Sequence, residues 1–368
     1  MPYKVRENLL IGNISDAAEI LRQGSEQITH ILSVLSSASV SFFTEWRNDI
    51  MIPAQEIRKV YFGGNGSEGN VTAESSTSLS HQKLLYSLEY AGKDLKFVRM
   101  AVALRDMESE NLLDYLEVCL DFIEEGRKKG CVLVHCFAGV SRSAAMVTAY
   151  LMRCEQLSYK DAIESLSQSC DSICPNDGFV DQLKMFEEMG FKVNHASSIY
   201  KRFHLKKLGE SYNCGETIDA SKFAEDPALP PRTQKITSFV DDEQKSSSMK
   251  AAIPTQAYRC KKCRRIVALQ DNVVDHVPGE GESAFAWSKR RNGFPFDKGD
   301  DNECSSLFIE PLQWMTTVGE GALEGKLSCI HCKARLGYFN WSGIQCNCGS
   351  WITPAFQLHK SRVDLSTL

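Results

Sequence analysis

A cysteine followed six positions later by an arginine gives the sequence its clearest chemical signal. Cys136 and Arg142 lie in the segment HCFAGVSRS, between the apolar run 131–134 and an apolar segment that starts at Ala144. A loop between a buried strand and a helix directs backbone N–H groups inward and forms an anion site. Its positive field favours the thiolate of Cys136, the nucleophilic form, and the planar guanidinium of Arg142 can bind two phosphate oxygens. The spacing therefore predicts attack by a thiolate on a phosphate ester.

The other residues of this loop have supporting roles in the same chemistry. We expect Gly139 to let the backbone turn tightly and approach the ligand. Ser143 is the better of two serines to stabilise the departing thiolate, and His135 is expected to orient the loop by hydrogen bonding. The residues predicted to surround the bound phosphate are Phe137, Ala138, Gly139, Val140 and Ser141.

The reaction also needs an acid that protonates the leaving oxygen. Asp106 lies in an acidic loop after an apolar run, 30 residues before Cys136. It is the predicted acid, and the predicted base for the attack of water in the second step. Glu108 and Glu110 are the alternatives.

A second chemical signal is the density of cysteines near the end of the chain. The sequence holds 14 cysteines, and two CxxC pairs and one CxC pair lie beyond residue 259. Two thiolates at this spacing can both face one tetrahedral metal ion, so the pattern predicts structural zinc sites. Seven cysteines need one further ligand to fill two sites. His276 is preferred, with His331 and His359 as alternatives, and the pairing is left open. The predicted ligands are Cys260, Cys263, His276, Cys304, Cys329, Cys332, Cys346 and Cys348.

The elements that must position the phosphate loop alternate between strands and helices. Short apolar runs at 9–12, 28–34, 97–104 and 131–134 predict strands, and 112–129 has the three- and four-residue spacing of a helix. This alternation predicts an α/β domain with a mostly parallel central sheet flanked by helices. We expect this domain to span residues 1–192, with a flexible polar insertion at about 63–80.

Composition limits the remaining possibilities. The chain has 368 residues, enough for two domains, and no apolar run long enough to span a membrane. It starts without the features of a secretory signal, so we expect reduced thiols and a location in cytoplasm and nucleus. The net charge of −5 does not indicate a nucleic-acid polycation. Residues 193–257 are expected to be a partly helical linker, and 258–368 a small β-rich zinc-binding domain.

The phosphate loop resembles the signature of the cysteine-dependent protein tyrosine phosphatases, and HCFAGVSRS is similar to that of their dual-specificity branch. The resemblance covers roughly residues 1–190, including Asp106 and the segment 175–183, in which it implies that Asn176 buttresses the phosphate loop. It implies a cysteinyl-phosphate intermediate, no metal in catalysis, and phosphotyrosine and phosphoserine or phosphothreonine substrates. Inositol phospholipids and RNA triphosphates are less favoured because the loop and its domain lack strong basic character.

The cysteine-rich tail resembles that of the dual-specificity phosphatase 12 family, through the segments FIEPLQWM at 308–315 and WITPAFQ at 351–357. This resemblance implies phosphoprotein substrates and a zinc domain that docks on pre-ribosomal particles and assists subunit maturation, partly independently of catalysis. Basic residues at 259–265 and 289–291 are compatible with RNA contacts there. The alternative is that they offset the negative charge of the zinc–thiolate centres.

Overall fold

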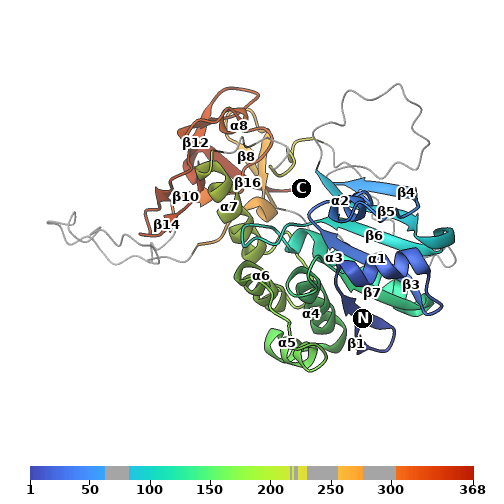
Figure 1. Cartoon of the computed structure of the whole chain (residues 1–368). Coiled ribbons are helices and arrows are strands. Elements are labelled where there is room, and N and C mark those ends of the chain that lie inside the picture. Colours follow the sequence, from blue (N-terminus) through green and yellow to red (C-terminus); the bar gives the residue numbers. More distant parts are fainter. Residues whose placement is uncertain (63–82, 216–217, 219–222, 230–255, 277–303) are drawn as a thin grey trace, which may run out of the picture. The chain divides into compact units, whose positions relative to one another are not determined.

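The computed structural model divides the chain into two compact units, unit 1 at Met1–Asn194 and unit 2 at His195–Leu368 (Figure 1). The residues that it describes are 1–62, 83–215, 218, 223–229, 256–276 and 304–368. The polar insertion predicted at 63–80 lies outside them, as do residues 289–291. Within the described residues, every helix is too short or too polar to cross a lipid bilayer.

Unit 1 is built around a seven-stranded sheet with the order β1-β2-β7-β3-β6-β5-β4. The strands are β1 (Tyr3–Arg6), β2 (Leu9–Gly12), β3 (Ile28–Leu35), β4 (Ala54–Tyr61), β5 (Leu84–Ala91), β6 (Phe97–Ala103) and β7 (Cys131–His135). The sequence predicted a mostly parallel sheet. Parallel pairing is confined to the four central strands β2, β7, β3 and β6, whereas β1, β5 and β4 pair antiparallel at the edges. The short connections β1–β2 and β5–β6 explain this difference, because a parallel pair needs a long crossover.

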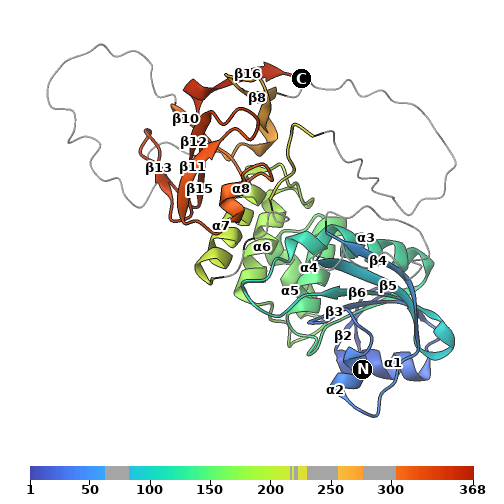
Figure 2. The same cartoon turned by 90° about the horizontal axis from the view of Figure 1, so that it is seen from above.

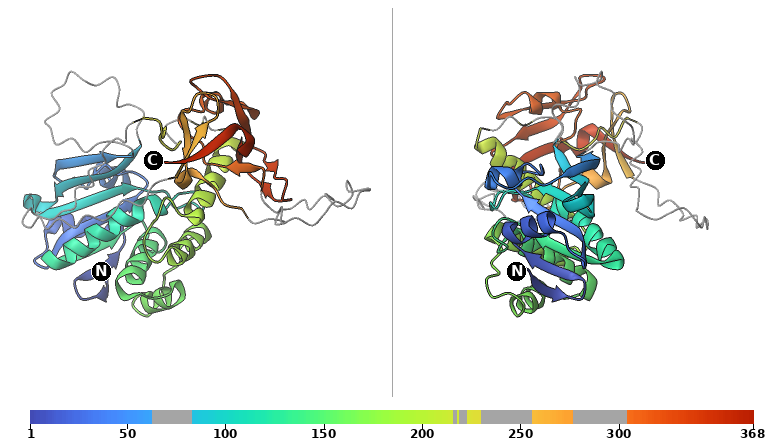
Figure 3. Two further views of the ribbon diagram at one scale, coloured as in Figure 1. Left: turned by 180° about the vertical axis from the view of Figure 1, so that it is seen from behind. Right: turned by 45° about the vertical axis from the view of Figure 1, so that its right-hand side comes forward.

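Helices cover both faces of the sheet. Unit 1 contains α1 (Ile14–Gln23), α2 (Phe42–Trp46), α3 (Leu113–Lys129), α4 (Arg142–Glu155), α5 (Tyr159–Ser167) and α6 (Asp177–Glu188), with the 3-10 turn η1 (Lys93–Leu95). Figure 2 shows α1 and α2 on one side of the sheet and α3, α4 and α6 on the other, which Figure 3 shows from behind. The strand β7 is buried along its whole length, as its apolar run predicted.

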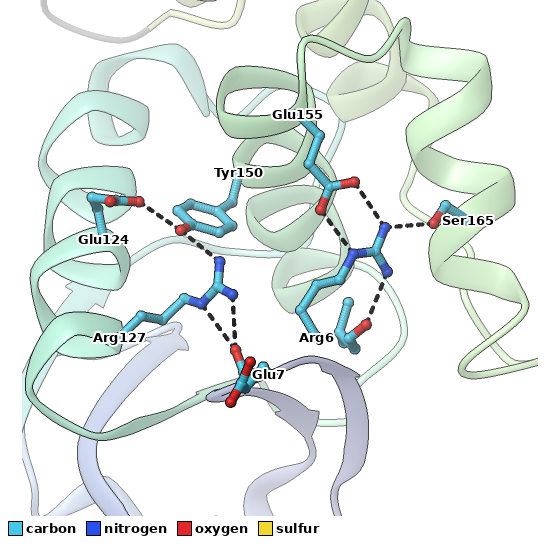
Figure 4. A network of polar contacts seen from close by, with 8 residues as sticks. Arg6, Glu7, Glu124, Arg127, Tyr150, Glu155 and Ser165 are labelled. Atoms are coloured by element: carbon cyan, nitrogen blue, oxygen red, sulfur yellow. Dashed lines mark hydrogen bonds and ion pairs between the residues drawn. The ribbon is translucent and has the colours of Figure 1, made fainter.

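A polar network anchors α4, the helix that begins at Arg142, to the edge of the sheet (Figure 4). Arg6 of β1 holds Glu155 at the end of α4 with two hydrogen bonds of 2.7 and 3.0 Å and also donates to Ser165 of α5. Arg127 of α3 donates to the hydroxyl of Tyr150 at 2.8 Å. These contacts fix the far end of the helix whose first turn carries the predicted phosphate-binding arginine.

Unit 2 is built from small antiparallel sheets. Their orders are β10-β15-β12-β11, β16-β8-β9 and β13-β14. The strands are β8 (Gln256–Cys260), β9 (Ile266–Leu269), β10 (Ser306–Phe308), β11 (Glu324–Ser328), β12 (Arg335–Asn340), β13 (Ile344–Gln345), β14 (Trp351–Ile352), β15 (Ala355–His359) and β16 (Val363–Thr367). The helical elements are α7 (Ser198–Asn213), α8 (Thr316–Gly319), η3 (Gln270–Asn272) and η5 (Lys360–Arg362).

The helix α7 is part of the core of unit 2, although the sequence placed residues 198–213 in a linker. Leu205 and Leu208 are 4% exposed and belong to the same apolar cluster as Trp341 and Phe356 of the sheets. Tyr212 stacks on Trp341 with 4.7 Å between the ring centres. The spacing of the apolar residues in α7 is compatible with a surface helix. Its packing against the sheets of unit 2 is visible only in the structure.

Candidate active site and metal centres

The loop of the predicted nucleophile joins β7 to α4 and surrounds the sulfur of Cys136. Cys136 is 1% exposed. Its Sγ accepts hydrogen bonds from the backbone N–H of Gly139 and the hydroxyl of Ser143, each at 3.2 Å. Both donors point at the sulfur, where they stabilise negative charge on it during the reaction. Ser143 therefore lies within hydrogen-bond distance of the sulfur that it is predicted to stabilise.

A close approach between the loop and the β2–α1 turn explains the glycine at position 139. Gly139 has φ +80°, and a Cβ there would lie 3.0 Å from the carbonyl oxygen of Gly12. The N–H of Ile14 donates to the carbonyl of Phe137 at 3.1 Å. The side chains of Phe137 and Ala138 are exposed and that of Val140 is half-buried, so the predicted rim of the loop faces solvent. Sequence reasoning did not identify Gly12 and Ile14 as supports, because they lie more than 120 residues before the loop in the sequence.

The buried His135 connects the end of β7 to the loop. One ring nitrogen, Nδ1, lies 3.1 Å from the carbonyl oxygen of Cys136, and the other, Nε2, lies 2.7 Å from Oγ of Ser33. Burial lowers the pKa of His135 to about 3, so the ring is neutral at physiological pH. Both ring nitrogens thus lie within hydrogen-bond distance of an oxygen, and the orienting role of His135 stays a prediction.

The predicted acid reaches the same loop from the end of β6. Oδ1 of Asp106 accepts hydrogen bonds from Oγ of Ser141 at 2.6 Å and from Nδ2 of Asn176 at 2.8 Å. Oδ2 lies 3.7 Å from Nε of Arg142. Of the alternatives, Glu110 accepts from Arg105 at 2.5 Å. Asp106 is thus the carboxylate that the structure brings to the loop.

Arg142 is held at the start of α4, where its side chain is 8% exposed. Its Nη1 donates to the carbonyl of Leu104 at 3.2 Å. The carbonyl of Leu104 and the carboxylate of Asp106 come from the same loop, so the guanidinium and the acid share one wall of the site. This arrangement holds the guanidinium beside the loop before a phosphate binds.

The helix α6 holds the acid loop in place, a contact that sequence reasoning missed. Asn176 caps α6 by accepting from the N–H of Phe179 at 3.0 Å while its amide donates to Asp106. Gln182, 1% exposed, accepts from the N–H of Leu112 at 2.7 Å and donates to the carbonyl of Glu110 at 2.9 Å. Asn176 thus contacts the acid directly, and its backbone N–H also donates to Oγ of Ser141 in the phosphate loop, which the resemblance implied that it buttresses, at 3.2 Å.

The eight predicted metal ligands form two separate groups of four. In each group the ligand atoms lie within 4.8 Å of one another. The first group is Cys260, Cys263, Cys329 and Cys332, and the second is His276, Cys304, Cys346 and Cys348. The pairing left open by the sequence is thus given by the structure, and His331 and His359 belong to neither group of four.

The distances in the first group fit a tetrahedral ion. Sγ of Cys260 lies 3.6 Å from that of Cys332, and Sγ of Cys263 lies 3.6 Å from that of Cys329. Four sulfurs at about 2.3 Å from one zinc ion would be about 3.8 Å apart. The N–H of Ala334 lowers the pKa of Cys332 to about 7, which favours the thiolate that a metal binds, whereas burial raises the pKa of Cys260. The donor set therefore fits zinc.

The two CxxC turns of this group have the same backbone form. Arg264 and Lys333, each directly after the second cysteine, have φ of 63° and 57°. Their N–H groups donate to the carbonyls of Cys260 and Cys329 at 2.8 and 2.9 Å. This left-handed turn brings both sulfurs of a pair to one side of the chain.

The second group combines the same soft ligands with an imidazole. Nε2 of His276 lies 3.3 Å from Sγ of Cys304. The ring of His276 packs edge-on against Phe308, with 5.2 Å between ring centres. Three sulfurs and one nitrogen form a closed four-ligand set of the kind that holds structural zinc.

Acidic partners offset several basic side chains near the first CxxC turn. Arg264 pairs with Asp364, and Arg265 pairs with Asp226. Lys261 lies 3.8 Å from the carboxylate of Asp364. These ion pairs with carboxylates argue against RNA binding at this part of the cluster and leave its expected role of offsetting the zinc–thiolate charge as a prediction.

Comparison with known proteins places these features in a family. The sequence profile described as dual specificity phosphatase, catalytic domain, matches residues 68–189. Dual specificity protein phosphatase 12 of Homo sapiens is 40% identical over 267 residues, which are 72% of this chain and 73% of the relative. A tyrosine-protein phosphatase of Saccharomyces cerevisiae is 30% identical over 373 residues, covering 98% of this chain and 90% of the relative. The crystal structure of a phosphatase domain from Chaetomium thermophilum is 22% identical, covers 51% of this chain and 95% of its own, and has a TM-score of 0.33.

Proposed function

The chain belongs to the dual-specificity phosphatase 12 family, and we propose that it hydrolyses phosphotyrosine, phosphoserine and phosphothreonine in proteins through a cysteinyl-phosphate intermediate. The observation that carries this proposal is the geometry around Cys136. Two hydrogen-bond donors lie at its sulfur, and an arginine and an aspartate share one wall of the same loop.

In the first step, the thiolate of Cys136 attacks phosphorus. The Sγ–P bond forms as the bond from phosphorus to the leaving oxygen breaks. Arg142 and the N–H groups of the loop bind the non-bridging oxygens, whose charge increases toward the transition state. Oδ1 of Asp106 already accepts two hydrogen bonds, so Oδ2 is the atom that carries the proton to the leaving oxygen.

In the second step, water releases the phosphate. Asp106, now a carboxylate, takes a proton from water as its oxygen attacks phosphorus and the Sγ–P bond breaks. The hydroxyl of Ser143 donates to the departing thiolate, as its 3.2 Å contact with the sulfur allows. The proton that Asp106 takes from water replaces the one that it gave to the leaving oxygen in the first step. The enzyme therefore returns to its starting protonation state.

The substitution Cys136→Ser tests this proposal. We expect it to abolish hydrolysis of an aryl phosphate and of a phosphopeptide, with the fold intact by circular dichroism. Cys119→Ser is the matched control, because Cys119 is a buried cysteine on α3. Equal activity of wild type and Cys136→Ser, or a wild type inactive between pH 5 and 8, would contradict the proposal.

The family and the two ligand sets also support a role for zinc in unit 2. Zinc bound by the two groups would supply cross-links between strands and turns of a unit that has only small sheets, as structural zinc does elsewhere. The proposed complement is two ions, one in each group, with no part in the phosphatase steps.

A second proposed function is docking of unit 2 on pre-ribosomal particles in cytoplasm and nucleus, with catalysis dispensable for this role. The separation of the units supports it: unit 2 has its own core, and its ligand groups contain none of the active-site residues. Because several basic residues at the first turn are paired with acids, a protein partner is favoured over RNA there. Rescue of a deletion strain by Cys136→Ser but not by Cys329→Ser would support this role, and the reverse pattern would refute it.

A further inference from the structure

A buried chain of polar side chains leads from β5 to the phosphate loop. Glu89 of β5 pairs with Nη1 of Arg99 on β6. Nε of Arg99 donates to Oγ of Ser33 on β3 at 2.8 Å, and Ser33 contacts His135 at 2.7 Å. Arg99, Ser33 and His135 are each 0% exposed. None of these contacts is required by the chemistry of the two steps above.

Each hydrogen bond in this chain has one possible direction. The carbonyl oxygen of Cys136 can only accept, so Nδ1 of His135 carries the ring proton. The neutral ring then accepts at Nε2, so the hydroxyl of Ser33 donates to it. The hydroxyl oxygen in turn accepts from the guanidinium of Arg99. In each hydrogen bond of this chain, the donor is therefore on the side of Arg99 and the acceptor is on the side of the phosphate loop.

A buried guanidinium is costly, and this one is only partly satisfied. Its Nη2 has no hydrogen-bond partner among the described residues. The ring of Phe43 packs against both Arg99 and His135, with 5.5 Å to the guanidinium and 5.9 Å to the imidazole ring centre. An apolar pair of similar volume is often no less stable than a buried ion pair, so stability alone is a weak reason for the Glu89–Arg99 pair.

We propose that Arg99 and Ser33 are positioning residues for the phosphatase reaction, which hold His135 in the form that fixes the first peptide of the phosphate loop. This inference rests on the proposed function. Hydrogen bonds in a chain polarise one another, so the cation strengthens the bond from His135 to the carbonyl of Cys136. Because a trans peptide is planar, fixing that carbonyl also fixes the N–H of Phe137 in the opposite direction.

The same chain contributes positive potential at the nucleophile. The charged groups that act on His135 are Arg99 from β6, Asp16 from α1 and Arg142 from α4. Asp16 is engaged in the cap of α1, where it accepts from the N–H of Asn13. Loss of the Ser33 hydroxyl would interrupt the hydrogen bonds between Arg99 and His135. The positive potential at Cys136 would then fall, which disfavours its thiolate.

The test uses the full chain and the pH dependence of Cys136 alkylation by iodoacetate, followed at that cysteine by peptide mass spectrometry. For Ser33→Ala we expect the alkylation midpoint to rise by about one pH unit, which is about tenfold less thiolate at a given pH. We expect a similar rise in the midpoint for the double variant Glu89→Gln/Arg99→Met. It neutralises both members of the buried ion pair, so no unpaired charge remains in the core. Ser33→Thr keeps the hydroxyl and should restore the wild-type midpoint.

Thr148→Val is the matched control, because Thr148 is a buried residue of α4 whose hydroxyl has no partner among the described residues. A midpoint unchanged in both Ser33→Ala and the double variant, or raised equally in Thr148→Val, would overturn the inference. If Ser33→Ala does not fold, the double variant decides alone. Alkylation needs no turnover, so a wild type that alkylates as expected but hydrolyses nothing would contradict the proposed function and leave this test valid.

Discussion

At the residue scale, the contact of Asn176 with Asp106 gives a prediction about leaving groups. Asn176→Ala removes one of two hydrogen bonds that hold Oδ1. A misplaced acid matters most when the leaving oxygen needs a proton, so we expect hydrolysis of phenyl phosphate to fall by about 10- to 100-fold. Hydrolysis of an aryl phosphate with an acidic phenol should fall much less. Steady-state kinetics with both substrates measure this difference.

Asn176 also caps α6, so the same variant should lose about 1 kcal/mol of stability. Ser158→Ala is the matched control, because Ser158 caps α5 by accepting from the N–H of Asp161 at 3.2 Å. We expect Ser158→Ala to lose a similar amount of stability and to hydrolyse both substrates at the wild-type rate. An equal fall for both substrates in Asn176→Ala would contradict a role in positioning the acid.

The buried neutral His135 predicts how acid destabilises unit 1. Its pKa is about 3 in the folded protein and 6.5 in its ordinary environment, so only the unfolded chain takes up a proton as pH falls below 6.5. The stabilising contribution is complete above pH 6.5 and is lost progressively toward pH 3. Between pH 7 and 5 the loss should be about 2 kcal/mol.

Urea unfolding at pH 7 and pH 5 measures this loss, and His135→Asn removes it. The pKa of His30 is also lowered, chiefly by burial, and acts in the same direction in both proteins. We therefore expect a smaller pH effect in His135→Asn rather than none. An identical pH effect in the two proteins would show that His135 is protonated in the folded state.

Whether a residue of the site can be predicted from the sequence depends on how far away in the sequence its contacts lie. Cys136, Arg142 and Ser143 follow from a local pattern, because one loop between a strand and a helix dictates what each must do. Ser33 and Arg99 carry no local signal, since a polar residue inside each of the apolar runs 28–34 and 97–104 does not indicate which side chain it will contact. Only the parallel pairing of β3 with β6 and β7 makes them neighbours of His135.

At the scale of elements, the central strands were easier to predict from the sequence than the strands and helices that pack against them. The apolar runs correspond to β2, β3, β6 and β7, and the spaced apolar residues of 112–129 correspond to α3. Among the antiparallel edge strands, β4 was missed because its sequence, AQEIRKVY, is mostly exposed and half polar. The helical part of the predicted linker corresponds to α7, but its packing on unit 2 was not predicted, because its apolar residues are few and its partner strands lie more than 40 residues away.

The packing of α7 predicts that it stabilises unit 2. Leu208→Ala should lower the stability of unit 2 by about 3 kcal/mol, because a 4% exposed leucine leaves a cavity. Four of the five tryptophans of the chain lie beyond residue 194, so thermal unfolding by tryptophan fluorescence reports mainly on unit 2. Leu365→Ala, at a 56% exposed position of β16, is the control and should change little. A melting temperature equal in Leu208→Ala and wild type would show that α7 is dispensable.

At the scale of the whole molecule, the sequence predicted two kinds of chemistry, and the structure gives each its own unit. The residues of the phosphatase site and its supports lie between positions 12 and 182, and all eight candidate ligands lie beyond 259. The sequence could count the ligands but could not pair them. CxxC spacing describes one turn, whereas a tetrahedral site needs two turns from strands such as β8 and β11, which end 68 residues apart.

This separation predicts that zinc and turnover are independent. Purified protein should hold two zinc ions, measured by native mass spectrometry. Removal by a chelator should change tryptophan fluorescence while aryl phosphate hydrolysis stays within about twofold of its starting rate, because the site around Cys136 draws no group from unit 2 among the described residues. A parallel loss of zinc and turnover would show that the units depend on each other.

The pairing of the ligands can be tested with variants that differ only in where the second cysteine lies. Cys332→Ser should lose one ion, and Cys260→Ser/Cys332→Ser should also lose one, because both sulfurs belong to the first group. Cys332→Ser/Cys348→Ser should lose both, because Cys348 belongs to the second. His276→Ala should lose the ion of the second group alone, whereas His331→Ala should retain two. If the two double variants lose equal numbers of ions, the eight ligands do not divide into these groups of four.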